Sequence, residues 1–250
     1  MDRILNIIKL FALWVVVFAL QKPLFMAYNH SLYRGTGMAD WLAVVWHGLP
    51  LDLSVAAALT VVPALLLIAS VWSGGGWWRK LLFIYYMVVS LLVAFVFVLD
   101  LLLHSYWGIR IDALSLSYFF TFPADMLAPV GWGVRLMALL LVFFLAAFIY
   151  LASLLPSVLP PLDRQRRLPA TAVMALLVAA LAIPIRGGLS KTPVTTSRVY
   201  FSDNMLLNAA AINPVFNVVE SWRREQDLAG HYRPGNDAGE CFEDDDSITT

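Results

Sequence analysis

Five long apolar stretches constrain the fold of this chain more than any other feature. Each approaches or exceeds the roughly 18–20 residues that a helix needs to cross a hydrocarbon core of about 30 Å. Because a segment in lipid must satisfy its own backbone hydrogen bonds, each stretch is predicted to be a helix and not an isolated strand. The stretches cover residues 4–28, 46–72, 78–104, 134–155 and 168–185.

The composition agrees with a membrane protein. Hydrophobic residues make up 60% of the chain and charged residues only 14%, too few to cover the surface of a soluble domain of this size. The formal net charge of zero gives no basic field that would favour a nucleic-acid partner. The single cysteine, Cys241, excludes an intrachain disulfide and is interpreted as incidental, because no apolar helix beside it supports a lipid anchor. The sequence predicts an all-α, polytopic membrane protein.

The basic residues of the short connections predict the orientation. The first stretch is long and lacks a small-residue cleavage site, so we expect a retained signal anchor with a cytoplasmic N-terminus. Five spans then place the C-terminus outside the cytoplasm, an arrangement that suits a bacterial inner membrane. The cytoplasmic side would carry Arg3, Lys9, Arg79, Lys80, Arg164, Arg166 and Arg167, against Lys22, Arg34, Arg110 and Arg135 opposite.

The chain is expected to have three parts. Residues 1–186 form the five-helix transmembrane domain, in which the aromatic-rich connection 105–133 is expected to lie in the outer interface. Residues 187–225 read as an extracytoplasmic linker and a juxtamembrane amphipathic helix, which Ser202 or Asp203 would cap. Residues 226–250 are polar and acidic, and we expect them to be disordered.

Charged side chains inside or beside spans are costly, so they mark candidate sites. Arginine suits the oxygen pair of a phosphate, and the external ends of the spans would bring several such residues together under the loops. An alternative is that these charges pair with one another and tie helices together, and a metal site that includes His47 is disfavoured because the ligand spacing is poor. The candidates for a lipid-headgroup site are Asp52, Asp100, His104, Arg110 and Arg135.

Three segments resemble the membrane part of a known enzyme family. They are residues 47–54 (HGLPLDLS), 100–112 (DLLLHSYWGIRID) and 200–217 (YFSDNMLLNAAAINPVFN). Together with the five spans and the external tail, they are similar to the membrane module of the lipoteichoic-acid-synthase-like enzymes. These enzymes are phosphoglycerol or phosphoethanolamine transferases of the alkaline phosphatase and sulfatase superfamily. The likeness extends over most of residues 1–225.

The resemblance implies chemistry that lies outside this chain. In that family an extracytoplasmic α/β domain holds a divalent metal, such as Mn or Zn, which activates a threonine or serine nucleophile. No catalytic residue and no metal ligand can be carried over to these 250 residues. We therefore expect a membrane anchor and lipid-substrate module that is inactive alone, with membrane lipid and a separate or downstream catalytic domain as its partners.

The alternative from another class is a non-enzymatic scaffold that binds a partner through its external tail. A transporter is disfavoured, because most of the charges lie near helix ends and not at the membrane midplane. Both remaining hypotheses use the region after the last span for docking. The candidates for partner docking are Tyr200, Phe201, Asn208, Asn213, Pro214 and Phe216.

Overall fold

The protein is all-α and polytopic over the residues that the computed structural model describes, which are 2–73, 76–154, 167–188 and 194–231. Five helices in these ranges are long and apolar enough to cross a membrane. The predicted fold class, a multi-pass membrane protein, is thus confirmed. The five helices are α1 (Asp2–Tyr28), α2 (Met38–Trp72), α3 (Trp77–Trp107), α6 (Trp132–Leu154) and α7 (Arg167–Arg186).

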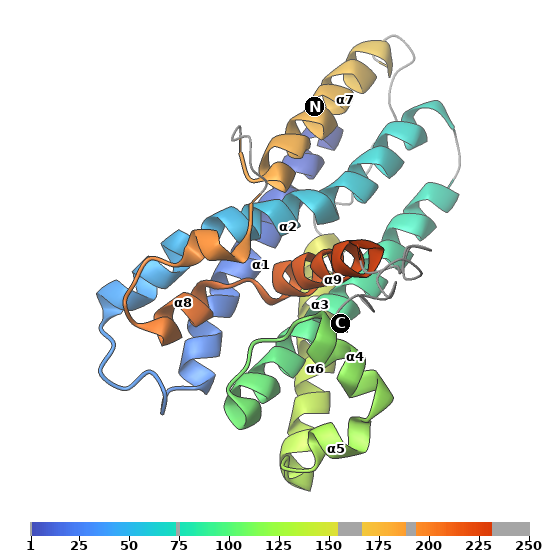
Figure 1. The fold of residues 1–250 in the computed structure, drawn as a ribbon. Coiled ribbons are helices and arrows are strands. Elements are labelled where there is room, and N and C mark those ends of the chain that lie inside the picture. Colours follow the sequence, from blue (N-terminus) through green and yellow to red (C-terminus); the bar gives the residue numbers. More distant parts are fainter. Residues whose placement is uncertain (1, 74–75, 155–166, 189–193, 232–250) are drawn as a thin grey trace, which may run out of the picture.

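Shorter helices gather near one end of this bundle (Figure 1). This is the end at which α1 stops and α2 begins. Between α3 and α6 the chain forms α4 (Ala113–Thr121) and α5 (Pro123–Leu127), where an aromatic interfacial segment was predicted. Residues 194–231, here called the C-terminal segment, form η3 (Thr196–Val199), α8 (Met205–Ala211) and α9 (Pro214–His231).

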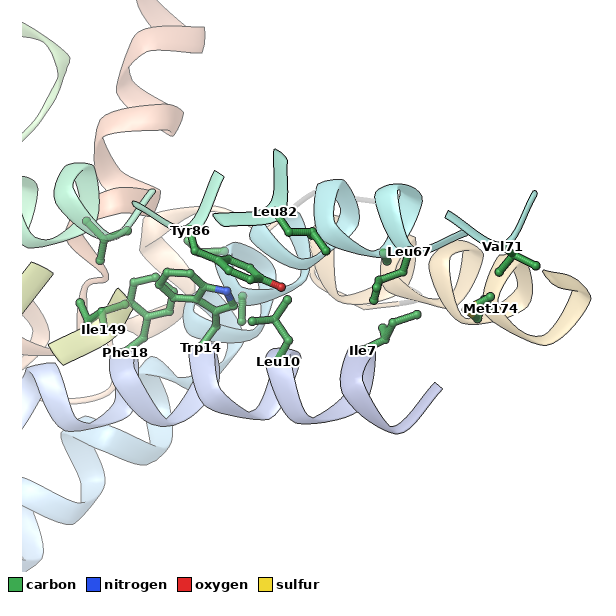
Figure 2. Packing of buried hydrophobic residues seen from close by; sticks show 14 residues of the cluster. Ile7, Leu10, Trp14, Phe18, Leu67, Val71, Leu82, Tyr86, Ile149 and Met174 are labelled. Carbon is green, nitrogen blue, oxygen red and sulfur yellow. The ribbon is translucent and has the colours of Figure 1, made fainter. Parts of the chain in front are cut away.

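The long helices pack in two groups. The most extensive pairings join α1 with α2, α2 with α7, and α3 with α6. In the largest core cluster Trp14 and Phe18 of α1 stack with their ring centroids 5.9 Å apart, and both side chains are 1% exposed or less. Figure 2 shows Tyr86 of α3 and Ile149 of α6 meeting these two rings, so the cluster joins the two groups.

Some element boundaries differ from the prediction. The second span begins at Met38 and not at residue 46, because Asp40 accepts a 2.8 Å hydrogen bond from the backbone of Gly37 and starts the helix earlier. Lys22, counted above as a loop charge, lies inside α1 and is fully buried. Residues 226–231, expected to belong to a disordered polar tail, form the last part of α9, which continues to His231.

Several predictions fall on residues outside the described ranges. These are the acidic tail from residue 232 onward, the role of Cys241, the end of the fourth span at residue 155 and part of the linker, 189–193. Arg164 and Arg166, two of the charges used for orientation, also fall there.

Candidate functional site

A buried ion pair joins α1 to α2 at the centre of the candidate site. The ammonium of Lys22 donates hydrogen bonds to both carboxylate oxygens of Asp52, at 2.6 Å to Oδ1 and 2.5 Å to Oδ2. Both side chains are 0% exposed. Desolvating two charges costs several kcal/mol per ion, so each needs the other to remain charged there.

Gly48 makes room for this pair. A Cβ atom at this position would collide with Lys22 and would lie 2.6 Å from the carbonyl oxygen of Ala211. The glycine therefore lets the lysine side chain pass between α2 and the end of α8.

A second buried ion pair joins α3 to the turn that follows it. Arg110 Nε donates to Asp100 Oδ1 at 3.0 Å, and its Nη2 lies 2.8 Å from Oδ2. The backbone N–H of Ile111 also donates to Asp100 Oδ1, at 2.9 Å. Asp100 is fully buried, and these contacts compensate its charge.

The same arginine holds the end of α8. Its Nη1 donates to the carbonyl of Ala209 at 2.7 Å and its Nη2 to the carbonyl of Ile212 at 2.8 Å. The last carbonyls of a helix have no partner within the helix and carry partial negative charge. Arg110 therefore caps α8 and neutralises Asp100 at the same time.

Asn213 links the first ion pair to the C-terminal segment. Its side-chain oxygen accepts from the backbone N–H groups of Val215 and Phe216, at 3.0 and 3.1 Å, which makes it the N-cap of α9. Pro214 follows as the first residue of the helix, a position that suits proline. The amide nitrogen of Asn213 donates to Asp52 Oδ1 at 2.9 Å.

Further contacts extend this attachment along α9. Asn217 Nδ2 donates to the carbonyl of Ile111 at 2.7 Å, and Ser221 Oγ accepts from the backbone N–H of Ala113 at 2.8 Å. The second bond satisfies an otherwise unpaired N–H at the start of α4. The contacts of Arg110, Asn213, Asn217 and Ser221 together form what we call the clamp.

The rings of Phe25, Tyr33 and His104 lie together beside the second ion pair. The His104 ring lies 4.8 Å from the ring of Phe25 and 6.5 Å from that of Tyr33, between centroids. Within the described part of the chain, neither ring nitrogen of His104 has a hydrogen-bond partner. Tyr33, in the connection between α1 and α2, donates from its hydroxyl to the carbonyl of Leu206 at 3.1 Å.

Burial sets the ionisation of Tyr33. It raises the pKa of the Tyr33 phenol to about 12; the nearby charge of Arg110 opposes this shift and that of Asp100 adds to it. The hydroxyl therefore stays protonated, and remains a hydrogen-bond donor, even at a pH slightly above 10, where a free phenol ionises.

The structure brings together most of the predicted headgroup residues. Asp52, Asp100 and Arg110 lie in one network, in which the polar groups of Asp52 and Arg110 are engaged by the chain itself, while His104 lies beside it through its ring contact with Phe25. The pairing of Asp100 with Arg110 matches the alternative in which charges tie elements together. Arg135 lies apart and donates to the carbonyls of Val130 and Leu127. The headgroup role of these residues stays a prediction.

The predicted docking residues make their contacts within the chain. Asn208 and Asn213 are buried, and Asn208 Oδ1 accepts from the N–H groups of Phe201 and Ser202, both at 3.0 Å. The Phe201 ring stacks on His47 with centroids 4.4 Å apart. Pro214 is buried, Phe216 is half-buried and Tyr200 is 58% exposed. An external partner for this surface stays a prediction.

Sequence reasoning missed Lys22 as a member of the site. It was counted among the loop charges, although the predicted stretch 4–28 includes it and the apolar run 24–28 is a signal that the helix continues past it. No group of three or more His, Cys, Asp or Glu side chains that could hold a metal ion occurs among the residues placed in the structure.

Comparison with known proteins adds no relative: no family model matches the chain, and neither do curated proteins or solved structures.

Proposed function

We propose that this chain is a membrane anchor and lipid module of the kind that lipid-headgroup phosphotransferases carry. In this proposal the bundle associates with membrane lipid, while the clamp fixes the C-terminal segment at the extracytoplasmic side. The clamp thereby holds a catalytic unit at a set position relative to the bilayer. This unit is either downstream on the chain or separate from it.

The clamp is the observation that carries the proposal. A segment that merely linked two units would need no buried partners in the bundle. Here instead the segment bonds directly to both buried ion pairs: Asn213 donates to Asp52, and the carbonyls at the end of α8 accept from Arg110, the partner of Asp100. Such contacts cost much to break, since each broken contact leaves a buried charge or carbonyl unpaired. The position of the segment is therefore set by the bundle.

The resemblance of residues 47–54, 100–112 and 200–217 supports the type of enzyme proposed. All three segments contribute to the clamp or its support, through Gly48 and Asp52, through Asp100 and Arg110, and through Asn213. The catalytic chemistry, with its divalent metal, belongs to the external unit in this proposal.

The test is to purify the product of the native locus from membranes with its bound partners and to measure phosphoglycerol or phosphoethanolamine transfer from a labelled lipid. We expect transfer by this native assembly, its loss on removal of divalent metal, and none by the 250-residue chain alone. Transfer by the chain alone would overturn the proposal. A native assembly with a bound partner but no transfer would also overturn it, and would favour the scaffold.

A further inference from the structure

A hollow between the two helix groups contains an unsatisfied polar side chain. Its volume is about 180 Å³, and fifteen of its sixteen lining residues are apolar. The sixteenth is Gln21 of α1, which is 5% exposed. In the described structure neither the nitrogen nor the oxygen of its side-chain amide has a hydrogen-bond partner. A buried amide with no hydrogen-bond partner is rare in native proteins, because its desolvation is not compensated, and here it points to a ligand.

The hollow is open toward the side of the bundle. Leu20 and Leu24 of α1 and Phe148 of α6 line it, and each of these side chains is more than half exposed, at 56%, 53% and 58%. On a helix bundle in a bilayer, such residues face the lipid chains. A molecule in the membrane can therefore enter the hollow sideways, without passing through water.

The two ends of the hollow differ in polarity. Gln21 precedes Lys22 of the buried ion pair, and the lining residue Pro214 follows Asn213, which bonds to the partner of that lysine. From Gln21 the hollow extends to Leu13, eight residues or about 12 Å along α1, between apolar side chains only. A ligand with one polar group and a hydrocarbon chain matches this arrangement.

Water fits the hollow poorly. A buried water needs two to four polar partners, and the Gln21 side chain is the one polar side chain in the lining. An ester carbonyl, in contrast, accepts a single hydrogen bond, which the amide nitrogen of Gln21 can donate, and the attached acyl chain fills apolar space. Esters with acyl chains are what membrane glycerolipids supply.

We propose that this hollow, which we call the Gln21 site, binds one acyl chain of a membrane glycerolipid, with the ester carbonyl accepting from the Gln21 amide. The bound lipid would also touch Pro214 and Val215 at the start of α9, next to the clamp. The site specifies the lipid-binding part of the proposed function and in that respect rests on it.

The test compares two lipids that differ at the ester alone. The full chain is purified in detergent, freed of lipid and titrated with a diacyl phosphatidylglycerol or with its dialkyl ether analogue of equal chain length, and bound lipid is counted by native mass spectrometry. We expect the wild-type chain to bind the ester lipid about two- to tenfold more tightly, the range of one net hydrogen bond. Gln21→Leu should lose this preference. Equal affinities in the wild type, or a preference that survives in Gln21→Leu, would overturn the proposal.

A second pair of variants tests the position. Ala152→Trp fills the far end of the hollow and should weaken binding of both lipids, whereas Ala147→Trp adds the same ring on an exposed face of α6 outside the lining and should leave binding unchanged. Unchanged binding in Ala152→Trp contradicts the site. Gln21→Leu removes an unpaired amide, so its stability without lipid should equal or exceed that of the wild type. If the Gln21 site fails these tests, the clamp is not affected. Trypsin cleavage of the C-terminal segment tests the clamp separately.

Discussion

The guanidinium carbon of Arg110 lies 4.1 Å from the centroid of the Phe25 ring. Phe25 is three residues after Lys22, so one face of α1 contacts both buried ion pairs. A cation over a desolvated aromatic face gains about 2 kcal/mol or more. This contact makes the two ion pairs, which lie on different helices, parts of one network that holds the C-terminal segment.

Arg110→Leu should be among the most damaging substitutions in the chain. It leaves Asp100 buried without its charged partner and removes the bonds to Ala209 and Ile212, so we expect a loss of about 3–5 kcal/mol in the free energy of unfolding. It should also free the C-terminal segment, which speeds trypsin cleavage after Arg198. The control is Arg34→Leu, at an exposed arginine near the same end, with an expected change within about 0.5 kcal/mol. Similar cleavage rates in the two variants would argue against the clamp.

The pair of Lys22 and Asp52 allows a rescue experiment. Lys22→Met should destabilise the protein by about 3–5 kcal/mol, because it leaves a buried carboxylate without its counter-charge. Adding Asp52→Asn removes that charge yet keeps an oxygen that can accept from Asn213, so the double variant should recover most of the loss. Thermal unfolding in detergent measures both, with the exposed Lys9→Met as control. If the double variant is no more stable than Lys22→Met, the unpaired charge of Asp52 is not the cause of the lost stability.

Gly48→Ala tests the close approach of α2 to the Lys22 side chain and to the end of α8. The added methyl group would collide with the Lys22 side chain and lie 2.6 Å from the Ala211 carbonyl, which is backbone and cannot rotate away. We expect a loss of about 1–3 kcal/mol, as for other overpacked positions. Gly133→Ala is the matched control in a helix, since no atom lies within 4 Å of its added carbon, and it should be neutral or slightly stabilising. Equal effects at the two sites would contradict the packing described here.

How far the sequence predicted this arrangement depends on the kind of feature. Hydrophobic length predicts the spans, because the bilayer allows few other structures. Hydrophobic length could not predict that Lys22 is buried, since a lysine near a span end more often extends its ammonium toward water. Only the tertiary contact with Asp52 explains why the Lys22 side chain lies inside the bundle. Arg135 was grouped with Arg110 as a charge at the external ends of the spans, but Arg135 bonds to nearby carbonyls before α6 and Arg110 bonds to the end of α8, and such partners do not follow from the sequence.

Stability at alkaline pH should reveal the buried phenol of Tyr33. Its pKa is about 12 in the folded protein and near 10 when unfolded. The contribution of the protonated phenol to the free energy of unfolding is therefore complete below about pH 10 and is lost as the pH rises through 12. Between pH 9 and 11.5 the Tm of the wild type should fall more steeply than that of Tyr33→Phe, because the variant has no proton to lose at this position. Parallel curves would mean that the phenol is not held protonated by burial.

The single cysteine provides a test of the predicted orientation. If the N-terminus is cytoplasmic, an odd number of spans places Cys241 outside, where a membrane-impermeant maleimide should label it in intact cells. The control is a Cys241→Ser variant that also carries Gly76→Cys, a substitution that the structure tolerates because no atom lies within 4 Å of the added carbon. Its thiol lies between α2 and α3, at the opposite end of the bundle, and should react only after the membrane is permeabilised. The reverse pattern would invert the topology and place the clamp at the cytoplasmic side, which would exclude an extracytoplasmic catalytic unit.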